Sequence, residues 1–145
     1  MSTYPSLSTR VIGQTEKTLN AILDRELAGT GLTESQWVML TLAVSSGGTV
    51  ERDQFARQVD GALKIGEAEA QARIDEMVAA QQLQPSSQGS AVTVTDAARQ
   101  LHGRIRTVVT EITGRLWGDL SAEDLATAGR VLSIITERAS AELAR

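Results

Sequence analysis

A histidine and an arginine stand four residues apart in this chain, at His102 and Arg106. Side chains at that spacing share one face of a helix, so the pair could hold a carboxylate or a phenolate. Trp37 could then stack on the ring of such a ligand. The alternatives are that Trp37 anchors the core and that His102 is a surface or interface residue whose hydrogen bonds are satisfied.

Catalysis has little support beyond that pair. The chain has one histidine and no cysteine, and Asp119, Glu123 and Asp124 lie at a predicted helix start, where acidic residues are expected. No glycine-rich phosphate loop follows a strand. We therefore expect no catalytic residue, no metal site, no cofactor and no enzyme. A repurposed pocket with His102 as a general acid or base is the alternative.

The composition indicates a single compact chain of 145 residues with a net charge of −4. The absence of cysteine suits a reducing compartment. No signal peptide opens the sequence, and no apolar stretch approaches the roughly 20 residues that span a bilayer. We expect a cytoplasmic protein that makes no contact with a membrane.

Apolar spacing predicts helices along almost the whole chain, and they must position the residues above. Two capping signals, Thr33 with Gln36 and Ser121 with Asp124, mark helix starts, and Thr95 caps another helix. The predicted elements are a helix from about Leu7 to Leu27, a helix from Thr33 to Val44, a short helix from Glu51 to Val59 with a turn at Asp60 and Gly61, a helix from Gly66 to near Leu83, a turn from Pro85 to Ser90, a strand from Ala91 to Val94, a helix from Thr95 to Gly118 and a helix from Ser121 to the C-terminus.

This order predicts a mainly α fold with a small β-hairpin, because helix, turn, helix and hairpin together make a winged helix-turn-helix. Residues 33–95 would form the winged-helix domain. Residues 1–32 and 96–145 would form helical dimerisation segments, since their apolar stripes are more than a chain of this size can cover. We expect a homodimer.

Four segments resemble parts of the MarR family of winged-helix transcriptional regulators. GLTESQWVMLTLAVSSGGTV (Gly31 to Val50) resembles the second helix and first strand, and RIDEMVAAQQL (Arg73 to Leu83) resembles the end of the recognition helix. VTVTDAARQL (Val92 to Leu101) is similar to the second wing strand and the fifth helix. LSAEDLATAGRVL (Leu120 to Leu132) is similar to the closing helix. The four segments stand in the order of the family, and the resemblance covers nearly the whole sequence.

The resemblance implies a dimer whose fourth helix enters the major groove of double-stranded DNA while the wing contacts the backbone or minor groove. It also implies a small aromatic or phenolic ligand that binds between the dimerisation and winged-helix parts and releases DNA. The residues on elements that line this cavity in the family are Trp37, Met39, His102 and Arg106.

The chain departs from the family pattern where the family contacts DNA. With Ile74 inward, the outer face of the fourth helix carries Ala68, Glu69, Ala72, Arg73, Asp75 and Glu76, three acids against one base. Residues 51–100 hold five basic and eight acidic residues, a net charge of −3. The predicted wing, Pro85 to Ser90, is short and uncharged. Dimers of this kind neutralise roughly 6 to 10 phosphates, so the sequence offers little of that attraction.

Two hypotheses follow. The first is a ligand-responsive, MarR-like homodimeric regulator with weak or atypical DNA contacts. Its candidate DNA-binding residues are Arg52, Arg57, Lys64 and Arg73 on the backbone, Gln71 and Glu69 on bases, and Ser87 and Gln88 in the wing. The second is a protein of the same fold that has lost DNA binding and uses its cavity for a ligand, a protein partner or a reaction.

Overall fold

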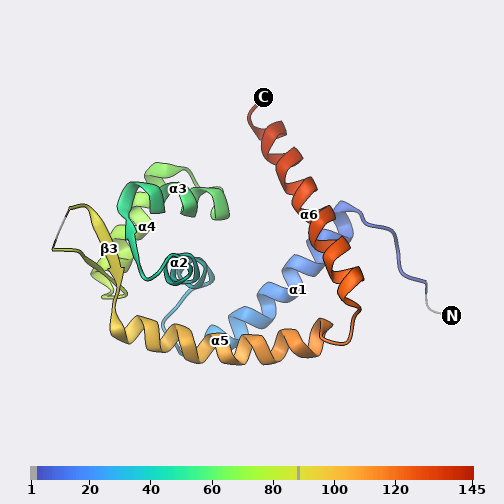
Figure 1. Cartoon of the computed structure of the whole chain (residues 1–145), viewed down its shortest axis with the longest axis horizontal. Coiled ribbons are helices and arrows are strands. Elements are labelled where there is room, and N and C mark those ends of the chain that lie inside the picture. Colours follow the sequence, from blue (N-terminus) through green and yellow to red (C-terminus); the bar gives the residue numbers. More distant parts are fainter. Residues whose placement is uncertain (1–2, 88) are drawn as a thin grey trace. The chain divides into compact units, whose positions relative to one another are not determined.

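The computed structural model describes residues 3–87 and 89–145 (Figure 1). Its elements are α1 (Thr9–Leu27), α2 (Glu34–Ser45), β1 (Thr49–Glu51), α3 (Arg52–Leu63), α4 (Glu67–Ala79), β2 (Leu83–Pro85), β3 (Ala91–Val94), α5 (Asp96–Trp117) and α6 (Ala122–Leu143). The predicted fold class, mainly α with a small hairpin in a winged helix-turn-helix, is confirmed. None of the helices in the described ranges is long and apolar enough to cross a membrane.

The chain divides into two compact units, one up to Val109 and one from Thr110 onward. The boundary falls within α5. The first unit holds α1 to α4, the sheet and the first part of α5, and the second holds the end of α5 and α6. The division of roles between residues 33–95 and the flanking helices stays a prediction.

The predicted helix starts are present as hydrogen-bonded caps. The Thr33 side chain accepts a bond from the Gln36 N–H, and the Gln36 side chain accepts one from the Thr33 N–H, which completes a capping box at α2. The Ser121 hydroxyl accepts the N–H of Asp124 at α6, and the Thr95 hydroxyl accepts the N–H of Ala98 at α5. These bonds satisfy N–H groups that have no partner within the helix.

The three strands form one antiparallel sheet in the order β1–β3–β2. Residues Val92 and Val94 of β3 are buried and point to the core, as the predicted alternation requires. Pro85 was predicted in the turn and instead ends β2, opposite Val92. An edge strand tolerates proline because the missing N–H would face away from the sheet.

Helix α3 is longer than predicted, because Asp60 and Gly61 do not form a turn. The helix continues to Leu63, whose half-buried side chain packs against the core. Lys64 then adopts a left-handed conformation (φ 57°), and its N–H bonds to the Asp60 carbonyl. The Asp60 carboxylate accepts the N–H of Gly66 at 2.8 Å, which helps to shape the entry to α4.

Helix α4 is shorter than predicted and ends at Ala79 rather than near Leu83. Gln81 adopts a left-handed conformation (φ 62°). The N–H of Gln82 bonds to the Met77 carbonyl and that of Gln81 to the Val78 carbonyl, which makes a Schellman motif. The helix stops here because Leu83 is a buried strand residue, 1% exposed, that must pair with β3.

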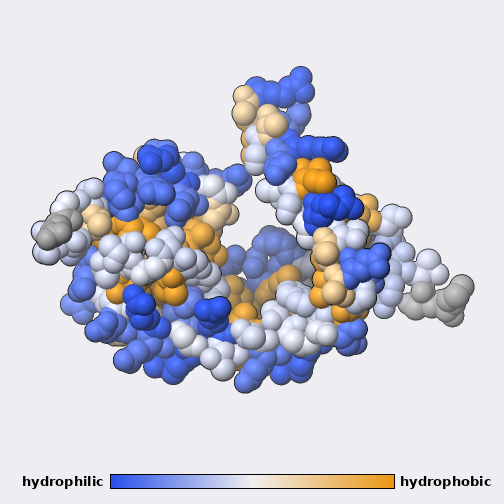
Figure 2. Space-filling view, in the orientation of Figure 1, coloured by the Kyte–Doolittle hydropathy of each residue, from blue (hydrophilic) through white to orange (hydrophobic). Residues whose placement is uncertain are grey.

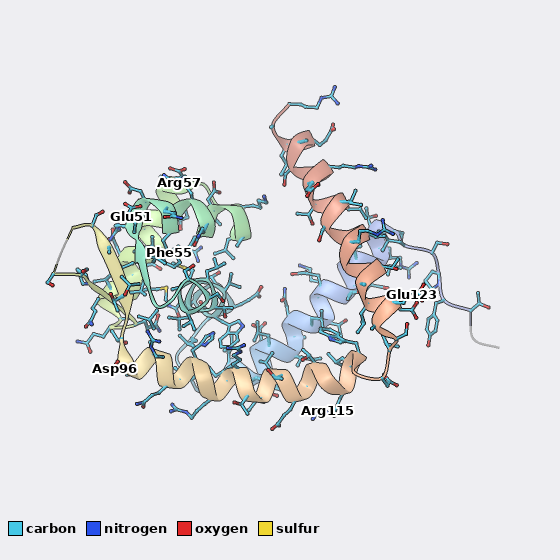
Figure 3. All side chains as sticks on the ribbon, viewed as in Figure 1. Glu51, Phe55, Arg57, Asp96, Arg115 and Glu123 are labelled. Atoms are coloured by element: carbon cyan, nitrogen blue, oxygen red, sulfur yellow. The ribbon has the colours of Figure 1, made fainter. Side chains whose placement is uncertain are left out.

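Helices α3 and α4 are joined by side chains that are almost completely buried. The predicted inward residues Ala70, Ile74 and Met77 of α4 are at most 1% exposed, as is Phe55 of α3. Figure 3 shows Phe55 on the inner side of α3 and Arg57 on the opposite side. The core therefore fixes the position of α4 and leaves the outer face of α4 in solvent.

The left-handed Gln81 yields a stability prediction. Gln81→Gly removes the steric cost of a β-carbon at positive φ, so the free energy of unfolding should rise by about 0.5–1 kcal/mol. The matched control is Ala79→Gly, which places glycine in helical backbone and should lower the free energy of unfolding by about the same amount. Urea denaturation followed by tryptophan fluorescence measures both. A destabilising Gln81→Gly would contradict the Schellman end.

Candidate nucleic-acid interface and the Trp37–His102 cluster

The outer face of α4 is exposed, and most of its charge is negative. Glu67, Glu69, Asp75 and Glu76 are all exposed, and Arg73 is half-buried. Residues 33–95 hold four basic and eight acidic residues, so their net charge of −4 equals that of the whole chain. The rest of the chain is therefore neutral on balance, and the excess acid lies entirely in the winged-helix segment.

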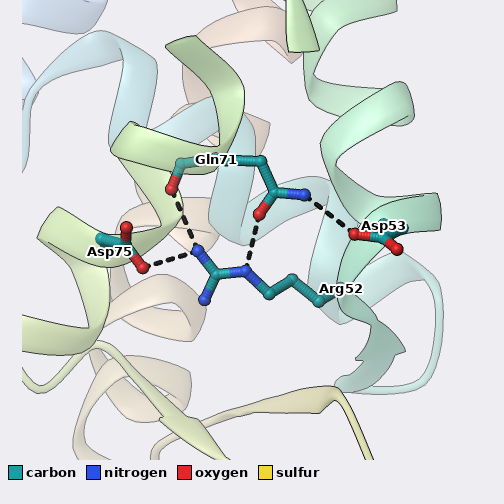
Figure 4. Close-up of polar contacts among 4 residues, drawn as sticks. All are labelled: Arg52, Asp53, Gln71 and Asp75. Atoms are coloured by element: carbon teal, nitrogen blue, oxygen red, sulfur yellow. Dashed lines mark hydrogen bonds and ion pairs between the residues drawn. The ribbon is translucent and has the colours of Figure 1, made fainter. Parts of the chain in front are cut away.

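Arg52, predicted to contact the DNA backbone, lies against α4 (Figure 4), and its role in DNA binding stays a prediction. Its Nε donates to Gln71 Oε1 at 2.6 Å, and its Nη2 donates to the Gln71 carbonyl at 3.1 Å and to Asp75 Oδ1 at 2.5 Å. Gln71 Nε2 in turn donates to Asp53 Oδ1 at 3.0 Å. These four residues, called here the α3–α4 clamp, tie the first turn of α3 to the middle of α4.

A second predicted DNA contact is also paired within the chain. Arg73 Nε donates to Glu69 Oε1 at 3.0 Å, four residues earlier on the same helix. The Glu69 side chain is 51% exposed, so the pair contributes little to stability. The pair places an acid beside the one base on this face of α4.

Arg57 and Lys64 are the exposed basic residues of α3 and its end. Arg57 extends from the outer side of α3 in Figure 3. Ser87 is exposed between β2 and β3, whereas Gln88 lies outside the described residues. The roles of all four in DNA binding stay predictions.

Glu51 joins the start of α3 to the hairpin. Its carboxylate accepts the N–H of Gln54 at 2.7 Å and the hydroxyl of Ser90 at 3.2 Å, and the Ser90 carbonyl accepts the N–H of Arg52 at 3.2 Å. The backbone N–H groups of Gln54 and Asp53, with a smaller contribution from Arg57, hold the pKa of Glu51 below its ordinary value. Glu51 therefore stays ionised as the cap of α3.

His102 is buried and packs on Trp37. The two rings stack with centroids 4.6 Å apart, and His102 Nε2 lies 3.0 Å from the Thr41 hydroxyl. That hydroxyl also donates to the Trp37 carbonyl at 2.8 Å. Because a hydroxyl has one proton, His102 Nε2 must then carry a proton and donate to Thr41.

Burial lowers the pKa of His102, and the nearby charge of Arg106 lowers it further. Arg106 itself is exposed, and Met39 is 1% exposed within the core. A cavity of about 170 Å³ opens along the same helix, lined by Glu26, Thr30, Leu101, Arg104, Ile105 and Val108. The structure thus brings Trp37 and His102 together, and the ligand-binding role of all four predicted residues stays a prediction.

Sequence reasoning missed Thr41, Arg104, Asp53 and Asp75 as members of these clusters. Thr41 had a signal, since it stands four residues after Trp37 and so shares its helix face. No signal in the sequence distinguished Arg104 from Arg106 as a residue beside the cavity. Asp53 and Asp75 pair across two helices, and no local spacing announces such a contact.

The buried histidine generates a pH prediction. Its folded-state pKa lies below the unfolded value of about 6.5, so the unfolded chain binds the proton more tightly. The stability from neutral His102 is complete above that pH and is lost as the pH falls below it. Since His102 is the chain's only histidine, urea unfolding at pH 8 and 5.5 should show a loss in the wild type that His102→Phe lacks.

Arg106→Gln provides the control, because it removes one cause of the lowered pKa while leaving the ring in place. Its loss of stability between the two pH values should be smaller than that of the wild type. A loss of equal size in His102→Phe would show that other groups cause it.

Comparison with solved structures gives strong likenesses at low identity. AbsC, a MarR family transcriptional regulator from Streptomyces coelicolor, matches 95% of this chain and 99% of its own with a TM-score of 0.74 and 17% identity. NadR in complex with 4-hydroxyphenylacetate matches 94% and 98%, with a TM-score of 0.69 and 17% identity. A mutant MarR from E. coli complexed with operator DNA matches 87% and 91%, with a TM-score of 0.67 and 15% identity.

No family profile and no curated protein sequence matches the chain. At such identities the structural likeness establishes the fold. The chain has the winged-helix fold of the MarR-family transcriptional regulators.

Proposed function

We propose that this chain is a MarR-like homodimeric transcriptional regulator that binds double-stranded DNA through weak and atypical contacts in the cytoplasm. The observation that carries the proposal is the exposed α4, held on α3 beside a β2–β3 wing, in a fold shared with a protein solved on operator DNA. An exposed helix in this position can enter a major groove. The chemistry of its surface then sets the strength of binding.

The available phosphate contacts are few. Arg57 and Lys64 are the exposed bases of residues 33–95, on α3 and at its end, and Arg52 and Arg73 are more covered and donate to acids of the chain. Two contacts from each protomer make four in a dimer, below the roughly 6 to 10 that support tight binding. We therefore expect weak binding with a log–log salt slope of about −3.6, from −0.9 per contact.

Base reading would fall to acceptor groups. Glu69 is half exposed on the outer face of α4, and a carboxylate can accept a bond from the N4 amino group of cytosine. Such a contact needs Arg73 to stay beside Glu69, because an isolated acid would be repelled by the neighbouring phosphates. The ion pair between the two side chains supports this arrangement.

A homodimer is the second part of the proposal. No residue of α6 is buried within the chain, although the helix carries an apolar stripe. Figure 2 shows apolar residues at the surface of α6. The exposed large apolar residues of α6 and its approach are Leu116, Trp117, Leu120, Leu125, Leu132, Ile135 and Leu143. A continuous apolar face of this length is typical of an interface between copies.

A second candidate function is ligand binding without DNA binding. The observation that favours it is the charge of −4 on residues 33–95, in which Arg52 and Arg73 are paired with acids of the chain. The stacked Trp37–His102 pair and the cavity beside Arg104 and Ile105 support binding of a small aromatic or phenolic anion. The same cavity would make a DNA-binding dimer responsive to such a ligand.

Fluorescence anisotropy tests DNA binding directly. The purified protein is titrated onto its own upstream DNA and onto random duplex across salt concentrations. Arg57→Gln should weaken binding and reduce the salt slope by about 1.8 for the two protomers. The matched control is Arg130→Gln on α6, which removes the same charge outside residues 33–95 and should leave the slope unchanged. Binding of the upstream DNA no tighter than random duplex at low salt would favour the ligand-only function.

Light scattering after size-exclusion chromatography tests the dimer. Ile135→Glu puts a charge on the apolar stripe of α6 and should convert a dimer to a monomer. Ala126→Glu adds the same charge to an exposed position on the opposite side of α6 from Ile135, by helical geometry, and should leave the dimer intact. A wild-type chain that elutes with the mass of one protomer would refute the dimer.

A further inference from the structure

Most of the N–H donors of the Arg52 guanidinium bind acceptors on α4. A guanidinium has five N–H donors. One from Nε binds Gln71 Oε1, and the two from Nη2 bind the Gln71 carbonyl and Asp75 Oδ1. The side chain is 27% exposed. A phosphate can therefore reach it fully only by displacing its partners on α4.

Gln71 is engaged at both ends of its amide in the same state. Its oxygen accepts from Arg52 and its nitrogen donates to Asp53. Reading an adenine requires the oxygen and the nitrogen of one amide together, on the N6 and N7 edge of the base. The α3–α4 clamp therefore keeps both Gln71 from contacting a base and Arg52 from contacting a phosphate.

Asp75 is the exposed end of this clamp. Its side chain is 71% exposed, whereas Arg52 is mostly covered. Exposed ion pairs contribute little to stability, so a strong anion can compete for Arg52 without unfolding the helix pair. Asp75 thus binds the group that a DNA phosphate would bind.

We propose that Asp75 is a specificity-determining residue that competes with DNA phosphate for Arg52 and, through Arg52, keeps Gln71 from reading a base. The inference rests on the proposed function, because it sets how strongly and how selectively α4 binds DNA. With Asp75 in place, binding is weak and uses few phosphates. Without Asp75, Arg52 becomes a phosphate contact and the Gln71 amide becomes a reader of adenine.

The test compares two substitutions that change the net charge equally. Asp75→Ala removes the competitor of Arg52, and Glu76→Ala removes the neighbouring exposed acid of α4. Alanine favours the helix in both. Anisotropy is measured with upstream and random duplex across salt, and thermal melts confirm that each variant is folded.

We expect Asp75→Ala to bind DNA about tenfold more tightly than the wild type, with a slope steeper by about 1.8 for two released arginines. Glu76→Ala should tighten binding only about twofold, from general charge. Adding Arg52→Gln to Asp75→Ala should remove the gain.

The outcomes separate the inference from the function on which it rests. Equal gains from Asp75→Ala and Glu76→Ala would overturn the inference while DNA binding stands. A gain that survives Arg52→Gln would overturn it as well. DNA binding by Asp75→Ala but not by the wild type would support the inference and reject the proposed function of the native chain. Failure of every variant to bind, with all of them folded, would reject both.

Discussion

The fold depends on one packing contact, the burial of α4 against α3. Ala70, Ile74 and Met77 meet Phe55 and its neighbours in a core that is closed to solvent. The small Ala70 lets the two helices approach closely, and the larger side chains fill the space on either side. Because this inner face buries the apolar side chains of the helix, the charge of its exposed outer face can vary without disturbing the core. A winged helix can therefore keep its architecture while its surface turns acidic.

The α3–α4 clamp and the Trp37–His102 cluster differ in whether their polar side chains are charged. In the α3–α4 clamp the charged side chains of Arg52, Asp53 and Asp75 each have a hydrogen-bond partner. Near solvent the free-energy cost of keeping them charged is small. His102 of α5, which is buried against Trp37, has a lowered pKa that favours the neutral ring instead, and it forms a hydrogen bond with Thr41. The difference follows from depth, since desolvation penalises an ion far more than a neutral ring.

Helical periodicity was enough to predict the inward residues of α4 and the caps at Thr33 and Thr95, because these depend on neighbours within a few residues. It placed the ends of α3 and α4 wrongly, where tertiary packing of Leu63 and pairing of Leu83 override local turn signals. The acidic character of the interface was visible in composition. The partners of Arg52 were not, because contacts with Gln71 and Asp75 span 19 and 23 residues and leave no repeat in the sequence.

The carboxylate of Glu51 connects α3 to the β2–β3 hairpin. One oxygen accepts the N–H of Gln54 in the first turn of α3, the other accepts the hydroxyl of Ser90 directly before β3, and the Ser90 carbonyl accepts the N–H of Arg52. These three hydrogen bonds attach the turn end of the β2–β3 wing to α3. Because α3 also packs against α4 in the core, α3 connects the wing to α4.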